Sequence, residues 1–485
     1  MQSKVLLLID YFRILVFIKI SPCNIILGRY FLGIAMENKF DLGIIGAGPA
    51  GYSAAIRASQ KGLNVVLFEK ECMGGVCLNK GCIPTKTILH CADFYRNLKK
   101  ADKFGIEIAE KSFDYEKIHN RKNDIVLRIQ KSLTKLVQSY GVEIITASAR
   151  LISEDKIEAD ENIYQCKNII LATGSKPTQI EGLETDGKFV LNSNDVLNLD
   201  NLPDNVLIIG SGAIGIEWAR IFSAFQKNVT VIELAERLLP AADSEISKRI
   251  ERLFKKEKIK FYTDTKIEKI ENKTVFLSDK QILNPDMILC AIGRKPVLPE
   301  MSEIELEKEG NFVKIDENFQ TNVKNIFAIG DLNGKMQLAH SAVHQSLAVV
   351  DFIAENKQCH FDTNKIPSVI YGNPEIAWVG KTEEMLQNTE YKVSNFPVAA
   401  LGKAMADDEI DGLVKVLSVN NRLVGAHVIS PEASSLIQQF ALMIDNELTT
   451  DVILKTVFAH PTYSEAVFEA VLGLDKMSLS LPKGL

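Results

Sequence analysis

A glycine-rich turn occurs twice in the chain, and this repeat constrains the fold more than any other feature. Residues 46–51 read GAGPAG and residues 210–215 read GSGAIG, so that the two copies are 164 residues apart (46 to 210). Each copy follows a short apolar run and precedes a helical stretch and a second apolar run. Such a turn lets the backbone approach a pyrophosphate at the start of a helix. One copy could arise by chance in a parallel α/β sheet, but two indicate two dinucleotide sites. The matched glycines are Gly46, Gly48 and Gly51 in the first copy and Gly210, Gly212 and Gly215 in the second.

An acidic residue ends the second apolar run of each copy. These acids are Glu69 and Glu233, again 164 residues apart (69 to 233). In dinucleotide-binding units an acid about 20 residues after the turn bonds the ribose hydroxyls. A carboxylate suits a free 2′-hydroxyl and repels a 2′-phosphate, so Glu233 favours NAD over NADP at the second site.

Later segments extend the two units and then depart from them. Residues 168–177 and 287–296 each read as a buried strand ending at a glycine turn, and each would close one nucleotide-binding sheet. Residues 325–331 (NIFAIGD) read as a strand that delivers an aspartate at its carboxyl end, where ligands of α/β sheets lie. From about residue 366, apolar segments at 369–371, 377–379, 413–416 and 423–429 predict an antiparallel sheet followed by two helices. The polar run at 115–140 predicts a surface helix.

Two cysteines lie five residues apart in the segment 74–86, GGVCLNKGCIPTK. A regular helix would separate Cys77 and Cys82 by ~7.5 Å along its axis, more than the ~4.4–6.8 Å between the Cα atoms of a disulfide. Gly81 and Pro84 supply the irregular helix start that a bridge needs. We interpret the pair as a redox-active disulfide, with Cys82 just before a helix N-terminus and therefore the more acidic thiol.

Two other interpretations of the cysteines remain. A metal cluster could use four of them, but the spacing lacks the usual paired C-x2-C arrangement. Two inert, buried cysteines are the ordinary alternative in an intracellular protein. The cysteines of the possible cluster are Cys72, Cys77, Cys82 and Cys91.

Composition limits the class of protein. The 485 residues suffice for about three domains, and the net charge of −6 gives no indication of nucleic-acid binding. Eight scattered cysteines indicate a reducing compartment. Residues 1–35 are apolar, but charges interrupt every run, so we expect no stable membrane insertion. We expect Met36 to be the working start and residues 1–35 to be an extension that the mature protein lacks.

His460 is a candidate base near the end of the chain. A lone histidine is more often a packed or capping residue, and the chain has seven histidines. Glu465, five residues later, could orient the imidazole and fix its tautomer, which a base requires.

Taken together, the segments GAGPAG, GGVCLNKGCIPTK, GSGAIGIE, NIFAIGD and HPTYSE resemble the flavin disulfide reductase family from about Met36 to the last few residues. Within the family they are most similar to the enzymes that oxidise dihydrolipoamide. The resemblance implies an α/β fold with two Rossmann-like domains, for FAD and NAD, and a C-terminal α+β dimerisation domain. The implied boundaries are 36–183 for the FAD domain with the redox disulfide, 184–297 for the NAD domain, 298–366 for a central segment that completes the FAD site, and 367–485 for the dimerisation domain.

The resemblance also implies roles for individual residues. Lys86 would lie beside the flavin ring, paired with Glu217, and Asp331 would bond the ribityl chain. The implied FAD contacts are Gly46, Gly48, Gly51, Glu69, Lys86, Thr173, Gly174, Ser175, Asp331, Ala339 and His340. The implied NAD contacts are Gly210, Gly212, Gly215, Glu217, Glu233, Ile267, Ala291, Gly293 and Arg294.

The implied reaction passes electrons between a substrate dithiol, the cysteine pair, FAD and NAD. Cys77 would exchange with the substrate sulfur, Cys82 would face the flavin, and His460, held by Glu465, would take the proton of the substrate thiol. In the family this histidine comes from the partner subunit, which implies a homodimer. The implied substrate is the lipoyl domain of a 2-oxoacid dehydrogenase or glycine cleavage complex, in the cytoplasm, or in the mitochondrial matrix if the source is eukaryotic.

Four residues depart from the family pattern. Val76 stands in place of a usual threonine, Gln345 and Ser346 in place of a Glu-Gly pair, and Tyr463 in place of a leucine beside the base. The alternatives are a glutathione or mercuric reductase and a non-catalytic structural paralogue. Residues after Glu233 lack the arginines of NADPH-dependent enzymes, and the last cysteine is Cys359, which is too early for a C-terminal cysteine pair.

Overall fold

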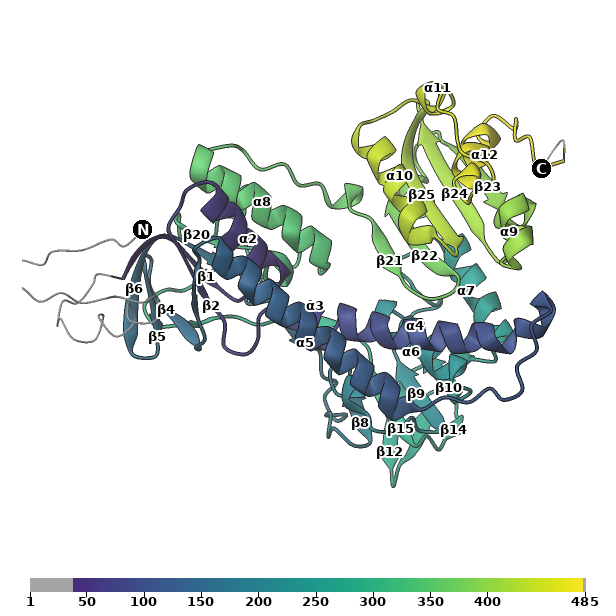
Figure 1. The fold of residues 1–485 in the computed structure, drawn as a ribbon, viewed down its shortest axis with the longest axis horizontal. Coiled ribbons are helices and arrows are strands. Elements are labelled where there is room, and N and C mark those ends of the chain that lie inside the picture. Colours follow the sequence, from purple (N-terminus) through teal and green to yellow (C-terminus); the bar gives the residue numbers. More distant parts are fainter. Residues whose placement is uncertain (1–37, 483–485) are drawn as a thin grey trace, which may run out of the picture.

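A computed structural model describes residues 38–482 of the chain. Figure 1 shows three sheet-centred parts, with helices α4 and α5 running from the first part across the second. The expected extension at residues 1–35 lies outside the described residues. Within residues 38–482, no helix is both long enough and apolar enough to cross a bilayer.

The first sheet is built around β1 (Lys39–Ile45), which lies between β2 (Val65–Phe68) and β6 (Asn162–Leu171) and runs parallel to both. Most residues of β1 are apolar and buried, as expected for a parallel strand that is covered on both faces. The order is β17-β4-β5-β6-β1-β2-β3, and β20 pairs with β6. Strands from beyond residue 300 therefore return to this sheet. The remaining strands are β3 (Glu143–Ile145), β4 (Ala149–Ser153), β5 (Lys156–Ala159), β17 (Glu300–Met301) and β20 (Ile326–Ala328).

Helix α2 (Pro49–Gln60) follows the first glycine turn and packs against α8 (Ala339–Glu355). Proline is favoured at a helix start because the first amide hydrogens have no partner within the helix. Arg57 and Asp351 join the two helices by an ion pair of 2.8 Å. The other helices of this part are α3 (Gly75–Lys80), α4 (Cys82–Lys99), α5 (Tyr115–Ser139) and the short 3₁₀ helices η2 (Ala101–Phe104) and η4 (Gly330–Asn333).

The second sheet repeats the same arrangement, in the order β11-β10-β9-β15-β8, with all pairs parallel. Its strands are β8 (Val190–Asn192), β9 (Asn205–Ile209), β10 (Asn228–Ile232), β11 (Lys260–Tyr262) and β15 (Met287–Cys290), and its helices are α6 (Ala213–Ala224) and α7 (Ser244–Lys256). A small sheet adjoins it, formed by β12 (Ile267–Glu271), β13 (Thr274–Leu277) and β14 (Ile282–Leu283). Two-stranded ribbons are formed by β7 (Ser175–Pro177) with β16 (Arg294–Pro296) and by β18 (Lys308–Glu309) with β19 (Phe312–Val313).

The C-terminal sheet is antiparallel, in the order β21-β22-β25-β24-β23. Its strands are β21 (Ser368–Ile370), β22 (Glu375–Gly380), β23 (Lys392–Pro397), β24 (Leu413–Val419) and β25 (Arg422–Ser430). Its helices are α9 (Gly402–Asp407), α10 (Ala433–Asp445), α11 (Thr450–Ile453) and α12 (Glu465–Gly473). The sequence predicted four of these strands but not β23, in which only Ser394 and Phe396 are buried.

Helix α4 holds the three parts together. It begins beside the first sheet, yet it buries Ile88, Leu89 and Tyr95 in an apolar core shared with α6 and the second sheet. Ile370 and Ile429 of the C-terminal sheet enter the same core. Helix α4 is therefore packed against both the second sheet and the C-terminal sheet, and the predicted α/β fold with a C-terminal α+β part is confirmed.

Candidate active site

Cys77 and Cys82 lie on either side of a break between two helices. Cys77 is in α3 and Cys82 is the first residue of α4, while Gly81 between them leaves the helical region (φ −151°, ψ −109°). The irregular helix start predicted from Gly81 is therefore present, although Cys82 opens the helix instead of preceding it. Both residues are half-buried free thiols in this structure.

The two thiols differ in acidity. A hydrogen-bonding interaction with Cys77 and the ammonium of Lys86 together outweigh the effect of burial and lower the pKa of Cys82 to about 7. The same interaction with Cys82 raises the pKa of Cys77, and burial adds to this rise. The sequence predicted Cys82 as the more acidic thiol, and the direction of both pKa shifts agrees with that prediction.

Lys86 lies one turn after Cys82 on α4 and forms an ion pair with Glu217 of α6. Its Nζ is 2.9 Å from Oε1 and 2.8 Å from Oε2 of Glu217. Burial alone would lower the pKa of Lys86, but the Glu217 carboxylate outweighs burial and raises it. The pairing of Lys86 with Glu217 that the family resemblance implied is therefore present. It connects α6 of the second part to the helix that begins at Cys82.

In the first glycine turn, a Cβ atom would fit at Gly48 but would clash with the backbone at Gly46 and Gly51. A Cβ at Gly46 (φ +101°) would lie 2.4 Å from Ala172 O, and one at Gly51 would lie 1.8 Å from Gly46 O. At Gly48 the nearest atom to a Cβ would be Gly75 Cα, 3.9 Å away. The open space is at the N-terminus of α2, where backbone N–H groups can bind an anion. The residues present therefore fit the pyrophosphate of a dinucleotide.

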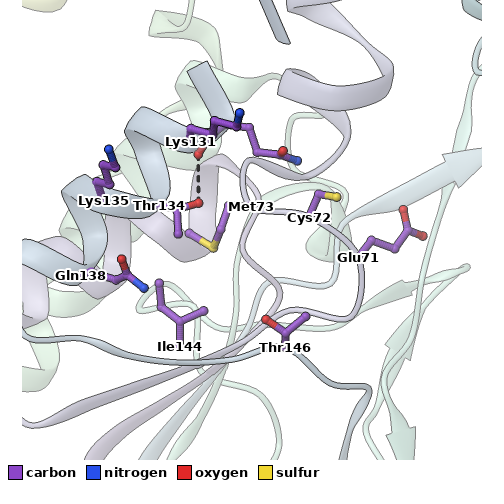
Figure 2. Close-up of a pocket in the computed structure, with 10 residues that line it drawn as sticks. Glu71, Cys72, Met73, Lys131, Thr134, Lys135, Gln138, Ile144 and Thr146 are labelled. Atoms are coloured by element: carbon purple, nitrogen blue, oxygen red, sulfur yellow. Dashed lines mark hydrogen bonds between the residues drawn. The ribbon is translucent and has the colours of Figure 1, made fainter. Parts of the chain in front are cut away.

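Glu69 connects this turn to a cavity of about 510 Å³. Its Oε2 accepts a hydrogen bond from Ala47 N (2.8 Å) and its Oε1 from Glu71 N (2.9 Å). Figure 2 shows the loop after β2 facing α5 across this cavity. The lining residues are Glu71, Cys72, Met73, Gln130, Lys131, Thr134, Lys135, Gln138, Ile144 and Thr146.

The sequence does not indicate this cavity, because residues 115–140 show only the pattern of a surface helix. Lys131 and Lys135 of α5 bring positive charge to one wall, and Figure 2 shows their side chains along that wall. No motif marks these residues. The one signal in the sequence is Glu69, which lies at the end of β2. Ligands of α/β sheets bind at strand ends, so a helix that packs beside β2 can line the binding site.

The second glycine turn reproduces the first. A Cβ at Gly210 (φ +96°) would lie 2.7 Å from Ala291 O, and one at Gly215 would lie 2.0 Å from Gly210 O. A Cβ at Gly212 would meet no atom within 4 Å. The turn at the start of α6 therefore also leaves room for a pyrophosphate, and Ala291, predicted for the same site, lies against it.

Glu233 occupies the position that Glu69 has in the first unit. Its Oε2 accepts hydrogen bonds from Ser211 N (2.8 Å) and Ser211 Oγ (2.7 Å), and its Oε1 from Ala235 N (2.9 Å). The carboxylate is thus fixed at the edge of the turn. Ile267 begins β12 and packs on the apolar cluster of the second sheet, while Gly293 (φ +111°) has open space around it.

Arg294 contacts residues that were predicted for the FAD site. Its Nε donates to Ser175 Oγ (2.8 Å) and its Nη2 to Ser175 O (2.7 Å), and Ser175 Oγ hydrogen-bonds to Asp331 Oδ2. Burial raises the pKa of Asp331. Gly174 (φ +71°) has no atom within 4 Å of a Cβ position, and the adjacent Thr173 hydroxyl donates to Val297 O. Arg294 was predicted for NAD, but its polar contacts join it to Ser175 and Asp331.

Helix α8 begins at Ala339 and His340. His340 Nε2 donates to Pro367 O (2.8 Å), and burial lowers the pKa of this imidazole. Further along α8, the fully buried Gln345 accepts from Gly330 N (2.7 Å) and Asn333 Nδ2 (2.9 Å). Gln345 therefore holds the turn that carries Asp331. Ser346 Oγ donates to the backbone of its own helix.

Tyr463 does not form part of the exposed surface. It is 2% exposed in the core of the C-terminal part, and its hydroxyl bonds Asp407 Oδ2 (3.1 Å). The Tyr463 side chain therefore packs inside the C-terminal part.

His460 and Glu465 form a hydrogen-bonded pair at the start of α12. His460 Nδ1 is 2.8 Å from Glu465 Oε1, and Thr462 N donates to Glu465 Oε2 (2.9 Å). Partial burial raises the pKa of Glu465, but the bonds from His460 and Thr462 outweigh it and lower the pKa. His460 is 75% exposed. Helix α12 packs on β23 and β24, far from α3 (Figure 1), so the chain itself does not bring this pair to the cysteines.

Comparison with known proteins gives a consistent result over most of the chain. Residues 40–346 match the family model described as pyridine nucleotide-disulphide oxidoreductase, and residues 366–471 match its dimerisation domain. Dihydrolipoyl dehydrogenase of Bacillus subtilis (strain 168) is 36% identical, with 91% of this chain and 99% of the relative covered. The protein of the same name from Chlamydia pneumoniae is 37% identical, with 92% and 99% covered.

Solved structures show the same fold. LpdA from Mycobacterium tuberculosis superposes with a TM-score of 0.83 at 23% identity, covering 89% of this chain and 99% of its own. The HOCl-induced flavoprotein disulfide reductase RclA from Escherichia coli gives a TM-score of 0.79 at 25% identity, with the same coverage.

Proposed function

The chain belongs to the pyridine nucleotide-disulphide oxidoreductase family, and we propose that within it the chain is an NAD-dependent dihydrolipoyl dehydrogenase. Its substrate would be dihydrolipoamide carried on the lipoyl domains of a 2-oxoacid dehydrogenase or glycine cleavage complex. The observation that carries the proposal is the arrangement of Cys77 and Cys82 on either side of the helix break at Gly81, with Lys86 one turn after Cys82 and bound to Glu217. We further propose a cytoplasmic location, or the mitochondrial matrix if the source is eukaryotic.

FAD would bind at the first glycine turn and NAD at the second. The open positions at Gly48 and Gly212 support this assignment, because each leaves room for a pyrophosphate at a helix start. The cavity beside Glu69 would receive the adenosine end of FAD, with Asp331 and Ser175 on the ribityl side. When bound, FAD supplies the two-electron chemistry that connects a dithiol to NAD.

The chain's own residues would carry out thiol–disulfide exchange. In the oxidised enzyme, a substrate thiolate attacks Cys77, the Cys77–Cys82 bond breaks, and Cys82 leaves as the thiolate. The second substrate thiol then attacks its own mixed disulfide, which releases oxidised lipoamide and the Cys77 thiol. Two electrons thereby move from the substrate dithiol to the cysteine pair. The low pKa of Cys82 supports its role as the leaving group, because a more acidic thiol leaves faster.

The base would come from a second subunit. The distance between α12 and α3 in Figure 1 supports an arrangement in which the partner subunit's His460 accepts the substrate proton. The match to a dimerisation domain over residues 366–471 supports a homodimer. Coexpression of Cys77→Ser with His460→Gln tests this arrangement. Mixed dimers would contain one intact site and regain activity, whereas a site confined to one chain would leave them inactive.

A substrate panel tests the reaction itself. Dihydrolipoamide, glutathione disulfide and mercuric ion are each assayed with NAD(H) and NADP(H), and we expect turnover only with dihydrolipoamide and NAD. Cys77→Ser should keep bound FAD and lose this turnover, while Cys91→Ser, on helix α4 with Cys82, should keep both. Near-normal turnover by Cys77→Ser would refute the mechanism. Turnover with glutathione disulfide and NADPH would favour the related reductase, and no turnover with any substrate would favour a structural paralogue.

A further inference from the structure

Tyr371 lies directly after β21, where the C-terminal sheet meets α4 and α6. Its ring centroid is 4.6 Å from Lys86 Nζ, and its backbone N–H donates to Glu217 Oε1 (3.0 Å). The half-buried side chain thus covers the ammonium on one side while Glu217 binds it on another. An ammonium over the face of a tyrosine ring within about 6 Å is attracted by the ring.

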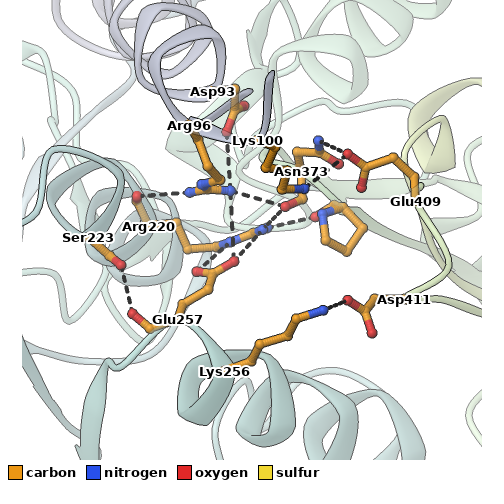
Figure 3. A network of polar contacts seen from close by, with 11 residues as sticks. Asp93, Arg96, Lys100, Arg220, Ser223, Lys256, Glu257, Asn373, Glu409 and Asp411 are labelled. Atoms are coloured by element: carbon orange, nitrogen blue, oxygen red, sulfur yellow. Dashed lines mark hydrogen bonds and ion pairs between the residues drawn. The ribbon is translucent and has the colours of Figure 1, made fainter. Parts of the chain in front are cut away.

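The turn that carries Tyr371 is held firmly against α6. Arg220, one turn after Glu217, donates from Nη1 to Pro374 O (2.6 Å) and from Nη2 to Asn373 O, and it pairs with Glu257 (2.9 Å). Arg96 of α4 adds a bond from Nη1 to Asn373 O (3.1 Å). Figure 3 shows both arginines converging on this turn. The backbone that carries Tyr371 is therefore held by α4 and α6 together.

Lys86 depends on such a support because its side chain is a flexible four-carbon chain with a compact charge. The side chain is 32% exposed, so water can reach it. Its ammonium lowers the pKa of Cys82, and this effect weakens with distance and with access of water. The other groups that act on Cys82, or on which Cys82 acts, are Cys77, Tyr52, Glu217, Arg294 and Tyr371.

We propose that Tyr371 is a positioning residue for the redox pair: its ring holds the Lys86 ammonium in place on α4, one turn from Cys82. This inference rests on the proposed function, in which Cys82 acts as a thiolate. The ring is the active part and not the hydroxyl, because the ring face contacts the ammonium. Substitution of the side chain leaves the backbone N–H to Glu217 in place, so the role of the ring can be tested alone.

The test is a titration of the Cys82 thiolate by its ultraviolet absorbance in the reduced, flavin-containing protein, from about pH 5 to about pH 9. The same titration of a Cys82→Ser variant in each background is subtracted. Tyr371→Leu should raise the pKa of Cys82 by about half a unit, so that the thiolate fraction at pH 7 falls about twofold. Tyr371→Phe, which keeps the ring, should titrate like the wild type. Lys86→Gln should give a larger rise than Tyr371→Leu.

Two outcomes would overturn the inference. One is an unchanged titration in Tyr371→Leu, and the other is an equal shift in Tyr371→Phe, which would assign the effect to the hydroxyl. If Tyr371→Leu does not fold, Tyr371→Met fills similar space without a ring face and replaces it. The titration needs neither NAD nor a dithiol substrate. Loss of the proposed reaction with an intact Cys82 shift would therefore refute the function alone, while turnover without the shift would refute only the role of Tyr371.

Discussion

Lys86 Nζ lies within 2.9 Å of both carboxylate oxygens of Glu217, and this ion pair joins α4 to α6 beside Cys82. Glu217 is almost fully buried, whereas the Lys86 side chain is partly exposed. The pair therefore connects the redox helix to the sheet that carries the second glycine turn. It also sets two opposite charges near one thiol, with the ammonium lowering the pKa of Cys82 and the carboxylate raising it.

Glu217→Gln should lower the pKa of Cys82, because the substitution removes the carboxylate that opposes thiolate formation and keeps the ammonium. Stability should fall by ~1–3 kcal/mol, less than the ~3–5 kcal/mol for breaking a fully buried pair, because Lys86 is partly hydrated. Thiolate titration measures the first effect and denaturant unfolding the second. A rise in the pKa of Cys82 would contradict the charge assignment.

Gly48→Ala should leave the fold intact and lower FAD affinity by at least about tenfold, the equivalent of ~1.4 kcal/mol. The backbone at Gly48 (φ −70°, ψ −175°) suits alanine, and the new Cβ would have no neighbour closer than 3.9 Å. The added methyl would instead occupy the space of the pyrophosphate. Bound flavin is measured by absorbance after dialysis, and folding by circular dichroism.

Two further variants provide the controls for Gly48→Ala. Gly51→Ala would place a Cβ 1.8 Å from Gly46 O and should destabilise the fold itself. Gly212→Ala meets no atom within 4 Å and should retain FAD while losing NADH binding. Full retention of flavin by Gly48→Ala would argue against the first turn as the pyrophosphate site.

The features that were predictable from sequence are those whose cause is local. Gly46 and Gly210 adopt positive φ and lie against a neighbouring strand end, where a Cβ atom would clash. Only glycine meets both conditions, so the glycine itself indicates the turn. The pair His460 and Glu465 is separated by five residues, and a short turn brings them together. The break at Gly81 likewise follows from a glycine between two helical segments.

Features created by tertiary packing could not be predicted in this way. Strand β23 lacks apolar alternation, because polar Ser394 is buried while apolar Val393 is exposed, and the strand is defined mainly by its pairing with β24. The wall that α5 contributes to the cavity depends on how that helix crosses the loop after β2. Tyr371 carries no motif, and its contact with Lys86 exists only because α6 and the C-terminal sheet meet at α4.

A buried ion pair between the second sheet and the C-terminal sheet should make stability depend on acid pH. Asp243, at the start of α7, accepts a bond from Lys415 Nζ (2.7 Å), and both side chains are at most 2% exposed. Burial alone would raise the pKa of Asp243, but the bond from Lys415 and the other favourable contacts outweigh it and lower the pKa. A carboxyl with a lowered pKa in the folded state stabilises the fold above its unfolded pKa, and this contribution is lost as the pH falls through the folded pKa.

Asp243→Asn should therefore cost ~1–3 kcal/mol at neutral pH, less than the ~3–5 kcal/mol for a buried charge left without any partner, because Lys415 keeps its ion pair with Glu383. Its loss of stability below about pH 4 should be shallower than that of the wild type. Unfolding by denaturant at several pH values measures both effects. Glu271→Gln breaks an exposed pair with Lys269 and should change stability by less than about 1 kcal/mol. Parallel pH profiles for wild type and Asp243→Asn would rule out this role for the ion pair.

Glu465→Gln should slow dithiol oxidation without affecting flavin content. The Glu465 carboxylate accepts from His460 Nδ1 and from Thr462 N, so it fixes the imidazole with Nε2 free to take a proton. General-base catalysis contributes about 10²–10⁴-fold, which sets the expected loss in His460→Gln, and Glu465→Gln should lose part of it. Thr462→Val keeps the backbone N–H that Glu465 accepts and should change the rate little. Electron transfer from NADH to an artificial acceptor does not need the base and should be unchanged in all three variants. Equal losses of both activities in Glu465→Gln would instead indicate a structural role for the carboxylate.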